Sequence, residues 1–242
     1  MTGTVQTVKP DTVSAVTDTL VPSINIPPDE LDAVNQTILF MQEAARGLLP
    51  ADVPTGESLY HSKVWYDTLT KALNESVGWV DVASSSKFST YEETHSGTLK
   101  LGDLVTEALQ AIAGNASSSI WSGLNKLISG NSEDPAITDF MNFWWGHTQT
   151  SKSYSDFGQS PTFHDANGQP CWGYAFFSVS NYIDDWRTMF VSSTYQEFKL
   201  KASGIMLKIN MTEWNRVKSD VVDQLGQDII KGIRTASLKH LK

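Results

Sequence analysis

The chain has 242 residues, of which 40% are apolar, 10% aromatic and 19% charged, a composition typical of chains that fold around a core. Wholesale disorder is therefore excluded. The net charge of -9 argues against nucleic acid as a partner, because such binding requires a basic surface. Apolar runs are short, and none approaches the roughly 18 to 20 residues of a membrane-spanning helix.

The two ends of the chain bear on where the protein acts. The start lacks the basic and apolar blocks of a secretory signal, so we expect a protein that is made in soluble form. Residues 199–242 carry nine basic and four acidic groups, which gives this segment a net charge of +5, whereas the rest of the chain has a net charge of -14. This basic end can steer the molecule toward an anionic surface, or it can be a solvated helix face.

The first part of the chain predicts a strand followed by a pair of helices. Residues 13–19 alternate in polarity and predict a strand that ends before Pro27 and Pro28. Over about 28–75, apolar residues recur every three or four positions on both sides of a proline-containing link, which predicts a helix hairpin. Short strands are expected at 77–83 and 88–94.

A second helix hairpin is predicted over about 100–130, with Gly114 and Asn115 at its turn. Three charged residues occur between 101 and 130, so this hairpin is either well buried or able to enter lipid. The residues expected to pack on the sheet, or to make contacts in an oligomer, are apolar and lie on its inner face: Leu104, Leu109, Ile112, Trp121 and Leu124.

The region of about 138–211 has a strand-like pattern and predicts the main sheet. Expected strands begin at Phe140, Tyr174, Met189 and Ile205, and Asn167-Gly168 and Ser203-Gly204 are turn signals. Several strands are apolar on both faces, as a sheet covered on two sides requires. A C-terminal amphipathic helix is predicted over about 212–240, capped by Thr212.

Taken together, the predicted helices and strands indicate an α/β fold. We expect a single three-layer α/β/α domain over residues 1–242, with a largely antiparallel sheet wrapped by two helix hairpins and followed by the C-terminal helix.

Catalytic and metal-binding motifs are not evident, so we predict no enzyme activity, no cofactor and no metal. The single cysteine, Cys171, excludes an intrachain disulfide and a multi-cysteine metal cage. A thiolate of Cys171 beside an imidazole, from His147 or from His164-Asp165, is the one plausible nucleophile pair. An isolated cysteine beside a tryptophan is, however, more often a small core residue.

Several strings, in their order and spacing, resemble the Cyt family of cytolytic toxins, which includes bacterial delta-endotoxins and fungal volvatoxin-like cytolysins. The resemblance covers about residues 10–212. The strings are Ile24-Asn-Ile, Asp32-Ala-Val-Asn-Gln-Thr-Ile-Leu-Phe-Met-Gln-Glu-Ala, Leu48-Leu-Pro, Phe140-Met-Asn-Phe-Trp-Trp-Gly-His-Thr and Gly168-Gln-Pro-Cys-Trp-Gly-Tyr-Ala-Phe-Phe-Ser-Val. The Phe140 string looks like the opening of the family's first long strand.

The resemblance implies a toxin that binds phospholipid membranes directly, forms a homo-oligomer, makes pores and lyses cells, with hemolysis and virulence as expected activities. It implies release or secretion followed by action at the target-cell membrane. In the family's model, the helical layers swing away and long strands enter the bilayer. This chain departs from bacterial members in its longer, more basic terminal helix, and it shows no obvious activation segment.

The residues expected to meet the membrane are aromatic and come from the predicted strands: Trp144, Trp145, Trp172, Tyr174, Phe176, Trp186, Phe190 and Tyr195. The same aromatics suit ordinary core packing. A helical alternative places the 100–130 hairpin in the membrane interface. A different function also stays open, namely a non-lytic lipid- or acyl-binding virulence module with Cys171 as the acylation point.

Overall fold

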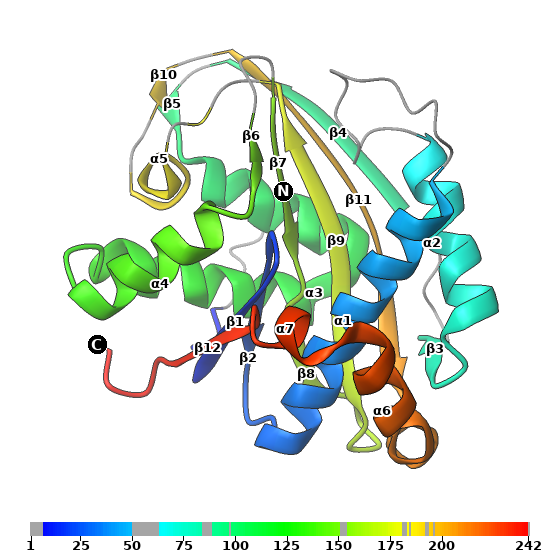
Figure 1. The fold of residues 1–242 in the computed structure, drawn as a ribbon. Helices are drawn as coiled ribbons and strands as arrows, with labels where there is room; N and C mark the ends of the chain where they lie inside the picture. Colours follow the sequence, from blue (N-terminus) through cyan, green and yellow to red (C-terminus); the bar gives the residue numbers. More distant parts are fainter. Residues whose placement is uncertain are drawn as a thin grey trace.

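A mixed sheet forms the middle of the molecule, and helices cover both of its faces (Figure 1). The structure, a computed structural model, describes residues 7–49, 63–83, 89–96, 98–150, 154–180, 183, 185–191, 194–195 and 197–241. The strand order is β12-β1-β2-β7-β9-β11-β3, with β4 also on β11, β6 on β7, and β8 on β2 and β9. All these pairs are antiparallel except β2 with β7 and β2 with β8.

The strands differ greatly in length, and the two longest, β9 and β11, lie side by side in the sheet. The strands of the main sheet are β1 (Thr12–Val16), β2 (Thr19–Ser23), β3 (Val80–Val82), β4 (Ser89–His95), β6 (Gln149–Thr150), β7 (Ser155–Gln159), β8 (Thr162–His164), β9 (Pro170–Val179), β11 (Phe198–Ile209) and β12 (Arg234–Ser237). Two short strands, β5 (Thr98–Leu99) and β10 (Thr194–Tyr195), pair with each other.

The helices form two layers, one on each face of the sheet (Figure 1). One layer holds α1 (Pro28–Leu48), α2 (Lys63–Ser76) and α6 (Met211–Leu225), and the short α7 (Gln227–Ile230) follows α6. The other holds α3 (Leu101–Gly130), α4 (Pro135–Trp145) and α5 (Trp186–Phe190). The predicted layered α/β fold with a largely antiparallel sheet is confirmed.

The element α3 is the predicted second hairpin. Gly114 has φ 76° and ψ -179°, so it breaks the helix into two arms. The arms lie against each other, since Trp121 Nε1 donates a hydrogen bond to the Gly102 carbonyl oxygen at 3.0 Å. A positive φ favours glycine over residues with a Cβ, so Gly114 is the residue that permits this turn.

The strand predicted to begin at Phe140 is wrong, because this segment is helix α4. Asp134 caps it by accepting hydrogen bonds from the backbone N–H groups of Ala136 and Ile137 at 2.8 and 3.4 Å. Pro135 occupies the first turn, where its missing N–H costs nothing. The buried side chains Ile137, Phe140, Met141 and Trp144 follow the helical spacing of three and four.

Two other strand-region predictions are corrected. The segment predicted as a strand from Met189 to Tyr195 begins with the last two residues of helix α5, which is capped by the Asp185 carboxylate, and its described residues after the helix include the two-residue β10. The turn predicted at Ser203-Gly204 is absent, since both residues lie inside β11. The turn at Asn167-Gly168 is confirmed, with Gly168 at φ 74°.

The C-terminal helix is shorter than predicted. It begins after Asn210, whose side chain caps it in place of Thr212, and it ends at Gly226, which has φ 76°. Residues 234–237 form β12, which pairs with β1 in the first part of the chain. The predicted helix over about 212–240 is therefore wrong beyond residue 225, except for the short α7.

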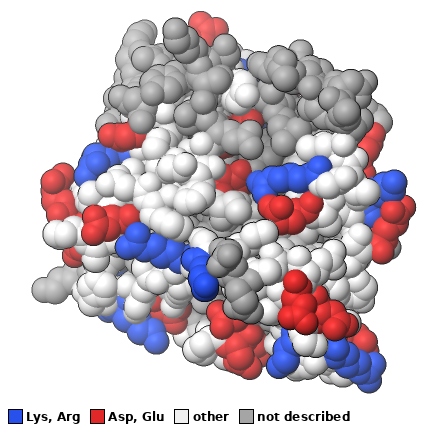
Figure 2. All heavy atoms as spheres, in the orientation of Figure 1, with Lys and Arg blue, Asp and Glu red and all other residues white. Residues whose placement is uncertain are grey.

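The basic C-terminal region does not form one charged helix face. Helix α6 itself carries two basic and three acidic side chains. Lys199 and Lys201 lie on β11, where both pair with Glu92 of β4. Acidic and basic groups are interspersed on the face shown in Figure 2. The second of the two interpretations, a solvated surface, fits this distribution better.

Candidate functional site

Strand β9 is buried from both sides, and its neighbour β11 is largely buried, except that Lys199, Lys201 and Lys208 are only partly buried. Every residue of β9 is buried. Its alternate side chains Trp172, Tyr174 and Phe176 contact the layer of α1, α2 and α6, whereas Phe177 and Val179 belong to the core under α3, α4 and α5. Because successive side chains of a strand point to opposite faces, one strand supplies both cores.

The α3 hairpin lies unusually close to this strand pair. A Cβ placed on Gly173 would lie 2.7 Å from the Cβ of Ala113 and 2.7 Å from Ser117 Oγ. A Cβ on Gly204 would lie 2.5 Å from the Tyr174 carbonyl oxygen and 2.9 Å from Ile112 Cγ2. These glycines therefore serve close approach between α3 and the sheet, which also explains why Gly204 marks no turn.

The five residues predicted on the inner face of the hairpin are all buried, in one apolar cluster with α4, α5 and the sheet. They are Leu104, Leu109, Ile112, Trp121 and Leu124. Their packing on the sheet agrees with the first of the two predicted roles. Contacts with another copy would require that these side chains leave the core.

Eight aromatics were predicted to meet the membrane, and the seven whose side chains are described do not share a surface. Six are fully buried, namely Trp144, Trp172, Tyr174, Phe176, Trp186 and Phe190, and Trp145 is partly buried. Trp144 and Trp145 lie on α4, and Trp186 and Phe190 lie on α5, so half of them come from helices instead of the predicted strands. The side chain of Tyr195 lies outside the described residues.

The turn between β1 and β2 joins the two helical layers through polar contacts that the sequence did not indicate. The buried Asp18 carboxylate accepts a hydrogen bond from Thr19 Oγ1 at 3.1 Å, and Thr19 Oγ1 accepts one from Gln42 Nε2 of α1 at 3.0 Å. From the opposite layer, Trp144 Nε1 donates to the Asp18 carbonyl oxygen at 2.9 Å. Both layers are thus bonded to one point of the sheet.

Cys171 is a buried thiol on β9, with 3% of its surface exposed. Burial, and then the charge of Asp165, raise its pKa to about 11. The predicted nucleophile pair is not assembled: His164 Nε2 lies 2.6 Å from Glu30 Oε2, and His147 is an exposed residue after α4. A buried thiol of high pKa is a poor nucleophile and a poor acylation point in this folded state.

We expect Cys171 to react slowly with an aromatic disulfide reagent such as dithiobis(nitrobenzoate). At pH 8, a pKa of about 11 leaves roughly one thiol in a thousand ionised, whereas an unfolded thiol is far more ionised. The absorbance of the released thiol, measured with and without denaturant, checks this. Equal rates in both conditions would show that the thiol is accessible in the native protein.

Two further features concern metal binding and membrane-spanning helices. Within the described residues, no group of three or more histidine, cysteine, aspartate or glutamate side chains is placed to hold a metal ion. No described helix has both the length and the hydropathy to cross a bilayer.

The fold and these contacts define a class: an α/β protein whose buried strand pair lies between two separate helical layers. No protein-family model and no curated protein sequence matches the chain.

Among solved structures, the chain is similar to the Evf virulence factor, with 12% identity, a TM-score of 0.39, and coverage of 94% of this chain and 84% of that chain. It is similar to the activated Cyt2Ba monomer from Bacillus thuringiensis subsp. israelensis, with 11% identity, a TM-score of 0.39, and coverage of 78% and 97%. A delta-endotoxin has 13% identity, a TM-score of 0.37, and coverage of 86% and 87%.

Proposed function

We propose that the protein is a membrane-lytic pore-forming toxin that binds phospholipid bilayers, oligomerises and permeabilises target cells. The observation that carries this proposal is strand β9, which is buried on both faces beneath helices that are separate elements, together with the largely buried strand β11 beside it. The sequence resemblance to Cyt cytolysins supports the same conclusion. Release from the producing cell and action at a target membrane belong to the proposal.

The strands have the dimensions that membrane insertion requires. A tilted strand crosses the hydrocarbon in roughly 9 to 11 residues, and β9 and β11 are 10 and 12 residues long. Backbone groups in lipid must all be paired, so these strands would have to join strands of neighbouring copies in a closed assembly. This requirement is the physical reason for proposing a homo-oligomer as the active form.

The α3 hairpin is the competing candidate for insertion. Gly114 divides it into two short arms, and Asp103, Glu107 and Lys126 are distributed over them. Each arm is too short to span a bilayer, although it could lie in the interface. We therefore assign final insertion to the strands and early membrane contact or contacts between copies to the hairpin.

Calcein release from phospholipid vesicles tests the proposed function. We expect leakage at micromolar protein, because exposed β9–β11 surface would enter lipid. Heat-denatured protein serves as the control. Intact vesicles, both before and after mild proteolysis of the protein, would refute the proposal. The acyl-module alternative has a separate measurement: an added mass removed by hydroxylamine in the intact mass spectrum would support it.

A further inference from the structure

The two sides of the β9–β11 pair differ in their chemistry. Gly173 of β9 and Gly204 of β11 face α3, because a Cβ at either position would meet side chains of that helix. Every second residue along each strand shares this α3-facing side, since successive side chains of a strand alternate between the two faces. The intervening residues, such as Trp172 and Phe176, lie under the layer of α1, α2 and α6 and form the α1-facing side.

The α3-facing side has no polar side chain over residues 173–179 of β9 and 200–206 of β11. It consists of Gly173, Ala175, Phe177, Val179, Leu200, Ala202, Gly204 and Met206. Phe157 of β7 adds to it, since its ring stacks on that of Phe177 with the centroids 5.4 Å apart. Lipid hydrocarbon could contact this side without burying a charge or an unpaired polar side chain.

Polar residues mark the borders of this apolar area. Gln159 of β7 pairs with Ala175, and Glu93 of β4 pairs with Leu200, so both lie on the α3-facing side at its edges. Lys208 follows at the end of β11, where a long basic side chain could reach the membrane–water interface. Strands β9 and β11 are therefore the strands whose α3-facing side suits lipid, and β4 and β7 are not.

The α1-facing side of the same two strands carries polar and charged groups among its apolar residues. They are Ser178 on β9 and Lys199, Lys201 and Ser203 on β11. Moreover, Trp172 Nε1 and Ser178 Oγ are buried and have no hydrogen-bond partner among the described residues. A buried polar group without a partner costs free energy, and contact with water would remove that cost. The α1-facing side therefore gains from hydration.

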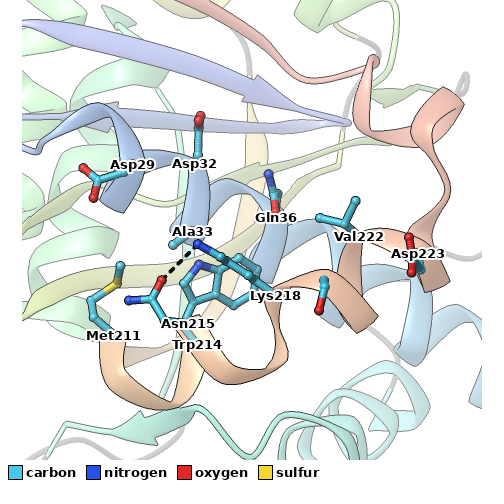
Figure 3. A pocket seen from close by; sticks show the side chains of 11 residues that line it. Asp29, Asp32, Ala33, Gln36, Met211, Trp214, Asn215, Lys218, Val222 and Asp223 are labelled. Carbon is cyan, nitrogen blue, oxygen red and sulfur yellow. Dashed lines mark hydrogen bonds between the residues drawn. The ribbon is translucent and has the colours of Figure 1, made fainter.

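The helices over the two sides differ in the same sense. Helix α3 carries three charged side chains in 30 residues, whereas α6 carries five in 15. The pocket on the outside of the α1 layer is lined by the charged residues Asp29, Asp32, Lys218 and Asp223 (Figure 3). A displaced α1 layer is thus suited to water, and a displaced α3 hairpin is suited to the membrane interface.

We propose that, in the membrane-inserted protein, the α3-facing side of β9 and β11 contacts lipid hydrocarbon and the α1-facing side lines the aqueous pore. This assignment rests on the pore-forming function proposed above. In membrane barrels, apolar residues that face the lipid alternate with polar residues that face the lumen. The neighbouring residues Ala202 and Ser203 of β11 then lie in lipid and in water, respectively.

Cysteine accessibility on phosphatidylcholine vesicles tests the assignment. Ala202→Cys and Ser203→Cys, each in a Cys171→Ser background, place a single thiol at adjacent positions that are equally buried in the structure, with 5% exposure each. The probe is a cationic methanethiosulfonate, which attacks hydrated thiolates and does not dissolve in hydrocarbon. On leaking vesicles, we expect it to modify Ser203→Cys at least about tenfold faster than Ala202→Cys, as measured by mass spectrometry.

The same variants in solution are the reference, in which both thiols should react slowly because both are buried. Ala175→Cys and Ser178→Cys repeat the comparison on β9, and circular dichroism confirms that each variant folds. Leakage with equal modification of both thiols, with faster modification of Ala202→Cys, or with modification of neither, overturns the assignment alone. Absence of leakage by the wild type removes the lytic function, and the assignment with it.

Ion selectivity provides an independent measurement. The Lys201 side chain is 38% exposed, so Lys201→Gln should fold, and it removes a positive charge from the proposed pore wall. In planar phosphatidylcholine bilayers under a potassium chloride gradient, the reversal potential should shift toward cation preference. Lys126→Gln, at an exposed position of α3, is the control and should leave it unchanged. Equal reversal potentials for wild type and Lys201→Gln would contradict a pore-lining position.

Discussion

A disulfide between the α3 hairpin and the sheet should abolish vesicle leakage until it is reduced. The proposed positions are Ser117 and Gly173, because a Cβ on Gly173 would lie 3.2 Å from the Ser117 Cβ, a few tenths of an ångström below the roughly 3.5–4.5 Å of a disulfide. All variants carry Ala113→Gly, because the new Cβ would otherwise lie 2.7 Å from the Cβ of Ala113. The variant Ser117→Cys/Gly173→Cys is made in a Cys171→Ser background, so that no third thiol competes. We expect oxidation to reduce the leakage rate by at least about tenfold, since the strands then remain covered by a covalently held helix.

Single-cysteine variants provide the controls for this experiment. Ser117→Cys and Gly173→Cys alone report any loss caused by the substitutions, and dithiothreitol should restore leakage in the double variant. A non-reducing mass measurement confirms that the bond has formed. Undiminished leakage by the fully oxidised protein would show that the α3 hairpin need not leave the sheet.

Trp144→Ala should destabilise the folded protein by about 3–5 kcal/mol, as for other large core aromatics. Trp144 is fully buried on α4, and its ring lies 6.3 Å from that of Phe157 of β7. The substitution also removes the hydrogen bond to the Asp18 carbonyl oxygen. Urea unfolding followed by circular dichroism measures the change in the free energy of unfolding.

The neighbouring Trp145 gives a matched comparison, because it is partly buried and should lose less stability when changed to alanine. Trp144→Phe keeps most of the apolar volume but removes the N–H donor, so it should lie between wild type and Trp144→Ala. Equal unfolding midpoints for Trp144→Ala and Trp145→Ala would contradict the placement of Trp144 between α4 and the sheet.

The layered fold could be predicted because its main elements follow local patterns. In α1, the buried residues Leu31, Val34, Ile38, Met41 and Ala45 recur at helical spacing. The turn of the α3 hairpin coincides with a glycine. The apolar residues on both faces of β9 indicated a sheet covered on both sides, and the two core clusters confirm it.

The wrong predictions concern segments whose amino-acid composition is compatible with both the periodicity of a strand and that of a helix. The string from Phe140 to Trp145 is rich in aromatic residues that favour strands, yet its apolar residues also recur at intervals of three and four. The decisive signal was the Asp134-Pro135 pair, which can cap a helix. Asp185 is likewise the capping residue of α5, and this role was not recognised from the sequence.

Other features depend on contacts between distant parts of the chain. Gly204 resembles a turn residue locally, but its lack of a Cβ serves the approach of Ile112 from α3.

The pairing of β1 with β12 has a consequence for synthesis. Val13 of β1 pairs with Ala236, and Thr19 of β2 pairs with Gly158, so β1 and β2 can pair with each other early, whereas their outer edges await partners that are synthesised much later. Such high contact order slows folding, and these outer edges stay unpaired meanwhile. A cell that makes this protein should therefore depend on chaperones that hold the growing chain until β12 emerges.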